Sequence, residues 1–164
     1  MPSRASGELH PLLLERSYWR NRLRELELER RSTIHVPRPD LSSPGKEVVE
    51  FRVRAHDGVR LWGLIARPTP RLGQQPVRIR VIGPCDPPTI DSTAMRNGWV
   101  EFVLQEPAGR RLVDRVLDVV RIFQVARETE GVDPERLEFE AESGGHAPDE
   151  FRIASRLLEG GYTN

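Results

Sequence analysis

From residue 47 onward the chain alternates between strand and helix patterns, and this order restricts the possible folds more than any other feature. Two segments of period-two alternation, 49–55 and 59–66, flank the turn sequence His56-Asp57-Gly58 and predict a β-hairpin. The later strand and helix patterns follow one another as 77–82, 90–96, 99–104, 111–130, 137–141 and 148–159. This order predicts an α/β domain with a mainly parallel sheet of about five strands and an antiparallel start.

The N-terminal part has a different pattern and sets the expected division of the chain. Residues 8–31 are typical of an amphipathic helix, which we expect to lie on the domain, although a dimer-forming helix is the alternative. Its apolar stripe comprises Leu9, Leu12, Arg16, Trp19, Leu23 and Leu26. Residues 32–46 are rich in proline and indicate a linker or an ordered loop. We therefore expect an N-terminal helix and linker over 1–46 and the α/β domain over 47–164.

Charged residues recur at every second position of the predicted strands, so each strand has one apolar and one charged face. These residues are Arg52, Arg54, Arg78, Arg80, Glu101, Glu138 and Glu140. A parallel sheet covered on both faces has nearly continuous apolar strands instead. We therefore expect the helices mainly on one face, and the other face to be exposed to water or to meet a polar partner surface.

Composition excludes several classes of function. The formal net charge is zero, which argues against nucleic acid as a partner. No apolar run approaches the length of a membrane span, so we expect no membrane segment and a cytoplasmic protein. Cys85 is the single cysteine and the four histidines are scattered, so we expect no disulfide, no metal site and no cofactor. The predominance of arginine over lysine is compatible with a heat-adapted source.

Four segments sharpen the interpretation. Tyr18–Leu23 contains an aromatic-Trp pair followed by leucine, and Phe51–Pro68 is a hairpin with a D-G turn. Val132–Leu137 reads VDPERL, and it precedes the segment Ala141-Glu142-Ser143-Gly144-Gly145, which resembles a G-x-S-x-G nucleophile elbow. In this order, the segments resemble the N-terminal half of the acetyl xylan esterase and cephalosporin C deacetylase family of α/β-hydrolases.

The resemblance assigns roles to two groups of residues. It implies that Ser143 is the nucleophile, within the elbow Ala141, Glu142, Gly144 and Gly145. The family's acid and base follow on later strands. We expect both to be absent here unless Asp149 or His146, a candidate base, substitutes for them.

The resemblance also places an oxyanion loop at Gly83, Pro84 and Cys85. There Pro84 has no N–H to donate, and such a loss typically costs about 10² to 10³ in rate. The family's D-x-R-G-x-G stretch is replaced by residues 105–110, QEPAGR.

The family's strand order makes two further predictions. Strand 77–82 should lie between strands 99–104 and 137–141, which would place Arg78 and Arg80 between glutamates of both neighbours. The strand from 137 to 142 should become an edge of the sheet. Its glutamates should discourage pairing with its own copy, since like charges would face each other.

Three hypotheses about function follow. The first is a catalytically inactive, hydrolase-like domain with a binding or assembly role, which we expect to form a homo-oligomer or to meet a protein partner over the charged sheet face. The alternative is a small carboxylic (acetyl) ester hydrolase that uses Ser143, with a base recruited from His146 or another chain. The third is a folded protein without a selected role. Fold similarity cannot choose among them.

Overall fold

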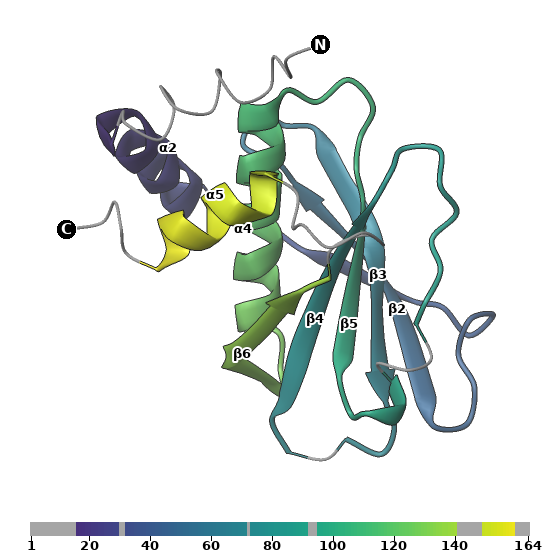
Figure 1. The fold of residues 1–164 in the computed structure, drawn as a ribbon. Helices are drawn as coiled ribbons and strands as arrows, with labels where there is room; N and C mark the ends of the chain where they lie inside the picture. The colour runs from purple at the N-terminus through teal and green to yellow at the C-terminus, as the bar shows by residue number, and fades with distance from the viewer. Residues whose placement is uncertain (1–15, 30–31, 72, 92–94, 141–148, 160–164) are drawn as a thin grey trace, which may run out of the picture.

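A computed structural model describes residues 16–29, 32–71, 73–91, 95–140 and 149–159 of the chain. These residues form one six-stranded open sheet with three helices packed against it (Figure 1). In chain order the elements are α2 (Arg16–Leu28), β1 (Ile34–Pro37), β2 (Lys46–Arg54), β3 (Arg60–Pro68), β4 (Gln75–Ile82), β5 (Val100–Gln105), α4 (Leu112–Glu128), β6 (Val132–Phe139) and α5 (Asp149–Leu158). The strand order across the sheet is β1-β2-β3-β5-β4-β6.

The sheet is mixed, so the prediction of a mainly parallel sheet of about five strands is wrong. The pairs β1–β2, β2–β3 and β3–β5 are antiparallel, and only β4–β5 and β4–β6 are parallel. The physical reason is that the hairpin does not stand apart from the parallel strands. Instead β3 pairs directly with β5, with Trp62 opposite Gln105. The parallel part is thereby limited to three strands.

Strand β1 occupies part of the segment that the sequence predicted to be a linker or loop. Ile34 lies opposite Arg52, and Val36 lies opposite Glu50, in an antiparallel pair with β2. All four residues of β1 are exposed, because β1 is an edge strand with nothing described beyond it. Pro37 ends the strand, which is one of the positions that a sheet tolerates for proline.

One face of the sheet carries all three described helices, which Figure 1 shows on the same side of the strands. The long helix α4 packs its apolar stripe against this face, and α5 and α2 pack beside it. The core between them contains side chains from both layers, among them Trp19, Phe51, Ile79, Phe102, Val120 and Phe151. Among the described residues, no helix is long and apolar enough to cross a membrane.

The opposite face carries the predicted charges, and the predicted strand order is confirmed because β4 lies between β5 and β6. The guanidinium of Arg80 lies 3.0 Å from the Glu101 carboxylate and 3.9 Å from that of Glu140. Arg78 lies in register with both Glu101 and Glu138. These contacts confirm the cross-strand pairing of opposite charges for Arg80, whereas the guanidinium of Arg78 pairs with Asp91 at 3.3 Å.

The expectation that this charged face is wet is wrong at its centre. Glu101 is 0% exposed. The cover comes from the loop after β4, since the Asp91 N–H donates to the Glu101 carboxylate at 2.7 Å and Arg80 donates to the carbonyl of Thr89. The segment after β4 therefore shields the middle of this face, with polar contacts at Glu101 and with Ile90 and Met95 against a small apolar cluster of Val48, Leu64 and Ala66. The rest of the ladder, represented by Glu138, stays exposed.

Strand β6 begins at Val132, five residues before the predicted start at Leu137. Its pairing with β4 is irregular between Gln75 and Val77, and regular register resumes at Leu137. The predicted helix over 8–31 is described only from residue 16, and α2 ends at Leu28. Of the helix predicted over 90–96, residues 92–94 lie outside the described residues, and 95–96 are helical.

Candidate functional site

The carboxyl ends of the parallel strands form the edge of the sheet where ligands bind in open α/β folds. Here β4 ends at Ile82, β5 at Gln105 and β6 at Phe139. The turn between β2 and β3 lies at the same edge, because β3 runs antiparallel to β5 and begins opposite its end. The first turn of α4 follows β5 at this edge. These segments together define the candidate site.

The predicted oxyanion loop lies directly after β4, and its backbone donor at Gly83 is already occupied. The N–H of Gly83 donates to the carboxylate of Asp86 at 3.0 Å, and the N–H of Asp86 returns a bond to the Gly83 carbonyl at 3.1 Å. An added Cβ at position 83 would lie 2.7 Å from an Asp86 carboxylate oxygen, so a side chain there would require the Asp86 side chain to move. The loop therefore closes on itself around Asp86.

A second interaction fixes the same loop to the sheet. The side-chain amide of Gln105 donates to the carbonyls of Pro84 and Asp86, at 3.2 and 3.1 Å. Cys85 is exposed as a free thiol between these two anchored carbonyls. The carbonyls and the Asp86 carboxylate are hydrogen-bond acceptors, so this part of the site offers little to a developing negative charge.

The other predicted catalytic residues lie outside the described residues. These are Ser143 with the elbow residues Ala141, Glu142, Gly144 and Gly145, and the candidate base His146. They follow β6 in the chain. Their predicted roles stay predictions.

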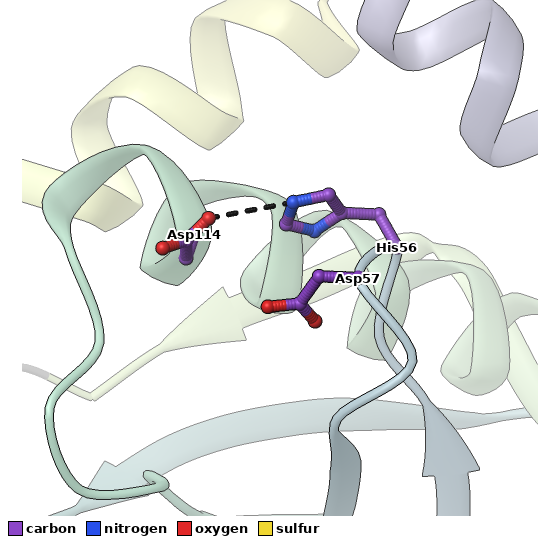
Figure 2. Close-up of side chains that lie close together, drawn as sticks. All are labelled: His56, Asp57 and Asp114. Atoms are coloured by element: carbon purple, nitrogen blue, oxygen red, sulfur yellow. Dashed lines mark ion pairs between the residues drawn. The ribbon is translucent and has the colours of Figure 1, made fainter.

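The structure brings together an ion-pair network that the sequence did not predict. Arg110 is 5% exposed and forms a bidentate pair with Asp118 at 2.5 and 2.8 Å, and it also contacts Asp57. Figure 2 shows His56 and Asp57, from the β2–β3 turn, facing Asp114 in the first turn of α4. The His56 Nε2 atom lies 3.4 Å from the Asp114 carboxylate. The network therefore joins the hairpin turn to the start of α4.

Three side chains of this network could in principle hold a metal ion. Ligand atoms of His56, Asp57 and Asp114 lie within 4.8 Å of one another. Two guanidinium groups already engage the carboxylates, since Arg110 pairs with Asp57, and Arg111 pairs with Asp114 at 3.0 Å. The hydrogen bond from Arg111 holds the pKa of Asp114 below its usual value. A cation would have to displace both arginines. The arrangement is instead suited to holding the β2–β3 turn against the start of α4.

Glu106 is a further acidic residue at this edge of the sheet, and the sequence did not indicate its environment. It follows β5 directly and its side chain is 22% exposed. Burial, reinforced by the nearby carboxylates of Glu150 and Asp118, raises its pKa, and Arg115 at 3.7 Å opposes that rise. Such a carboxyl group can retain a proton at a pH where a solvated glutamate has lost it.

A cavity of about 340 Å³ opens beside the network, between the end of α2, the hairpin turn and α4. His56 contributes to its wall, together with Glu29, Ser32, Arg54 and Arg121. Arg121 is almost fully buried and donates to the Glu29 carboxylate at 2.8 Å. Of the charges that line the cavity, Arg121 and Glu29 are thus paired with each other, and the cavity does not include the loop at 83–86.

Comparison with solved structures places this arrangement in a known fold. The acetyl xylan esterase from Paenibacillus sp. R4 matches 87% of this chain with a TM-score of 0.69 and 14% identity. Acetyl xylan esterase 1 from Thermoanaerobacterium sp. JW/SL YS485 matches 86% with a TM-score of 0.70 and 12% identity. The chain has an α/β-hydrolase-like fold. The resemblance to acetyl xylan esterases that the sequence motifs indicated is thereby supported over most of the described chain.

A more distant neighbour is a cold-adapted esterase from an Arctic intertidal metagenomic library, with a TM-score of 0.50 over 63% of this chain. The chain spans about half the length of these structures, 55%, 53% and 52% of each in turn. No family profile and no curated protein matches the sequence.

Proposed function

We propose that this chain is a hydrolase-like domain that does not hydrolyse esters and that acts by binding or assembly. The observation that carries the proposal is the closed loop after β4, in which the Gly83 N–H donates to Asp86 and Pro84 has no N–H. Ester hydrolysis of the serine type requires free donors aimed at the oxyanion. The fold is that of esterases, while the loop lacks these free donors at two successive positions.

The charge of Asp86 adds to this effect. The Asp86 carboxylate accepts the N–H of this loop, so a negative charge that developed beside the loop would meet a carboxylate instead of a free donor. Removing a single donor from an oxyanion hole costs about 10² to 10³ in rate. At Pro84 the loop has no N–H, and the Gly83 N–H beside it is engaged by Asp86, so the loop has no free donor at either position to replace the lost one.

The binding role is supported by the charged sheet face. This face leaves Glu138 exposed and carries Arg80, which pairs with Glu101 and Glu140, and Arg78, which pairs with Asp91. Charge-patterned surfaces of this kind favour specific partners with complementary charges and exclude others. A homo-oligomer or a distinct protein partner fits this surface.

The test is hydrolysis of p-nitrophenyl acetate by the purified protein beside the Ser143→Ala variant. We expect equal, near-background rates for the two proteins. A rate that exceeds background in the unmodified protein and disappears in Ser143→Ala would overturn the proposal and establish the ester hydrolase instead. Light scattering on the same samples measures the oligomeric state, for which we expect a mass above that of the monomer.

A further inference from the structure

Strand β6 forms one edge of the sheet, and no described strand pairs with its outer side. Figure 1 shows β6 as the outermost strand, beside β4. Sheet edges carry rows of unpaired N–H and C=O groups and can accept a further strand. The outer side of β6 is therefore a place where an extended segment can be added.

The backbone of β6 shows which groups are available there. The N–H of Glu140 donates to the Ile79 carbonyl of β4 at 3.0 Å. Backbone groups alternate in direction along a strand, so those of Glu138 also point toward β4 and those of Leu137 and Phe139 point away from it. The regular end of β6 thus offers donors and acceptors at two positions to an incoming strand.

The side chains specify the chemistry of that strand. On the face opposite α2, α4 and α5 the charges alternate from strand to strand, as Glu101 on β5, Arg80 on β4 and Glu140 on β6. Glu138 is exposed, and no described cation lies within ion-pair distance of it. On the other face Phe139 packs against the rings of Phe123 and Phe151. The next strand should therefore present cations on one face and apolar side chains on the other.

A second copy of the same strand does not satisfy this pattern. Pairing β6 with its own copy would place Glu138 and Glu140 opposite one another, and like charges directly across a strand pair are destabilising. The occupant must differ from β6 in charge.

We propose that the β6 edge binds an extended segment of a separate protein, with arginine or lysine at alternate positions and apolar residues between them. The segment adds a seventh strand beyond β6, with its cations against Glu138 and Glu140. This inference rests on the proposed binding role and names the partner's chemistry.

The test uses two synthetic peptides of nine residues, one with alternating arginine and valine and one with alternating glutamate and valine. Fluorescence anisotropy of labelled peptides measures their binding to the full chain at low salt. We expect the basic peptide to bind and the acidic one to bind at least about threefold more weakly, since each cross-strand charge pair changes sign. Glu138→Arg should abolish the preference, because it leaves one charge of each sign, at positions 138 and 140, opposite the incoming strand.

Two controls separate strand addition from general charge attraction. Glu135→Arg changes the same charge outside the regular register, and it should leave the preference for the basic peptide intact. N-methylation of the peptide's alternate amides that face β6 should abolish binding, because it removes the backbone donors. Equal binding of both peptides, or binding that survives N-methylation, would overturn the proposal.

The result of the peptide-binding experiment is independent of the result of the esterase assay. Ser143-dependent hydrolysis with charge-selective peptide binding would reject the proposed function and keep this site. Background hydrolysis without peptide selectivity would keep the proposed function and reject this site. Dimerisation of the free chain that Glu138→Arg abolishes would identify a second copy as the occupant and refute the proposed partner.

Discussion

The buried carboxylate of Glu101 should be one of the positions most sensitive to substitution on the face opposite α2, α4 and α5. It is 0% exposed and accepts bonds from the Asp91 N–H at 2.7 Å and from Arg80 at 3.0 to 3.1 Å. Glu101→Ala removes the acceptor of both donors at once. A buried donor left without a partner costs about 1 to 3 kcal/mol. Arg80 is 17% exposed and keeps Glu140 at 3.9 Å, so it loses only part of its stabilisation.

The expected loss for Glu101→Ala is therefore about 3 kcal/mol in the free energy of unfolding, measured by urea denaturation. Glu101→Gln retains an oxygen for Asp91 but loses the charge, and should cost about 1 kcal/mol. Glu138→Ala is the matched control, because it removes a glutamate from the same face of a neighbouring strand at an exposed position and should change little.

The decisive result is the order of the losses in unfolding free energy, which should be largest for Glu101→Ala, smaller for Glu101→Gln and smallest for Glu138→Ala. If Glu101→Ala is as stable as the Glu138 control, the loop from Gly83 to Asp91 does not depend on this carboxylate. The account of a loop that shields the sheet through polar contacts at Glu101 would then be wrong. An increased susceptibility of this loop to proteolysis in Glu101→Ala alone would support it.

Three further outcomes are expected. Gly63→Ala should destabilise the fold by about 1 to 3 kcal/mol in the same urea assay, because the added Cβ would lie 2.2 Å from the Val103 carbonyl oxygen and 2.6 Å from the Phe51 ring. An unchanged urea midpoint of unfolding would contradict this packing of β3. Arg110→Met should cost about 3 kcal/mol because it leaves the buried Asp118 unpaired, whereas Arg111→Met, at an exposed guanidinium, should change little; equal effects would refute the role of Arg110 in holding the β2–β3 turn. Burial raises the pKa of Glu101, so the folded state binds the proton of this carboxyl more tightly than the unfolded state does. The free energy of unfolding should therefore fall as pH rises from about 4.5 through the folded pKa. A Glu101→Gln variant with the same pH dependence of the unfolding free energy would exclude Glu101 as its source.

The parts of the fold that follow from local pattern were predictable from the sequence. Alternation around the D-G turn defines the hairpin, and the resemblance to esterases places β4 between β5 and β6, with Arg80 between two glutamates. Strand β1 was missed because Pro37 and Pro39 dominate its segment, and the pairing that makes it a strand is supplied by β2.

The ion-pair network could not be predicted, because its members are distant in sequence. Asp57 was assigned only to a turn, and Arg110 only to a loop that departs from the family pattern. One local signal was present, since Asp114 and Asp118 lie four residues apart on one face of α4, and the structure shows that both are buried. Two buried carboxylates on one helix require cationic partners, and this requirement could have directed attention to Arg110.

The position of β6 also bears on the order in which the chain folds. Strands β2 and β3 are joined by a short turn, whereas β6 reaches β4 only after β5 and α4 have been traversed, with Leu137 beside Val77. Closing such a long loop costs more entropy than closing a hairpin, so we expect the hairpin to form early and β6 to join late. In native-state hydrogen exchange, the amides of β6 should then open at a lower free energy than those of β3. Strand β6, the last strand to pair, would then also be the strand that pairs most readily with an added strand.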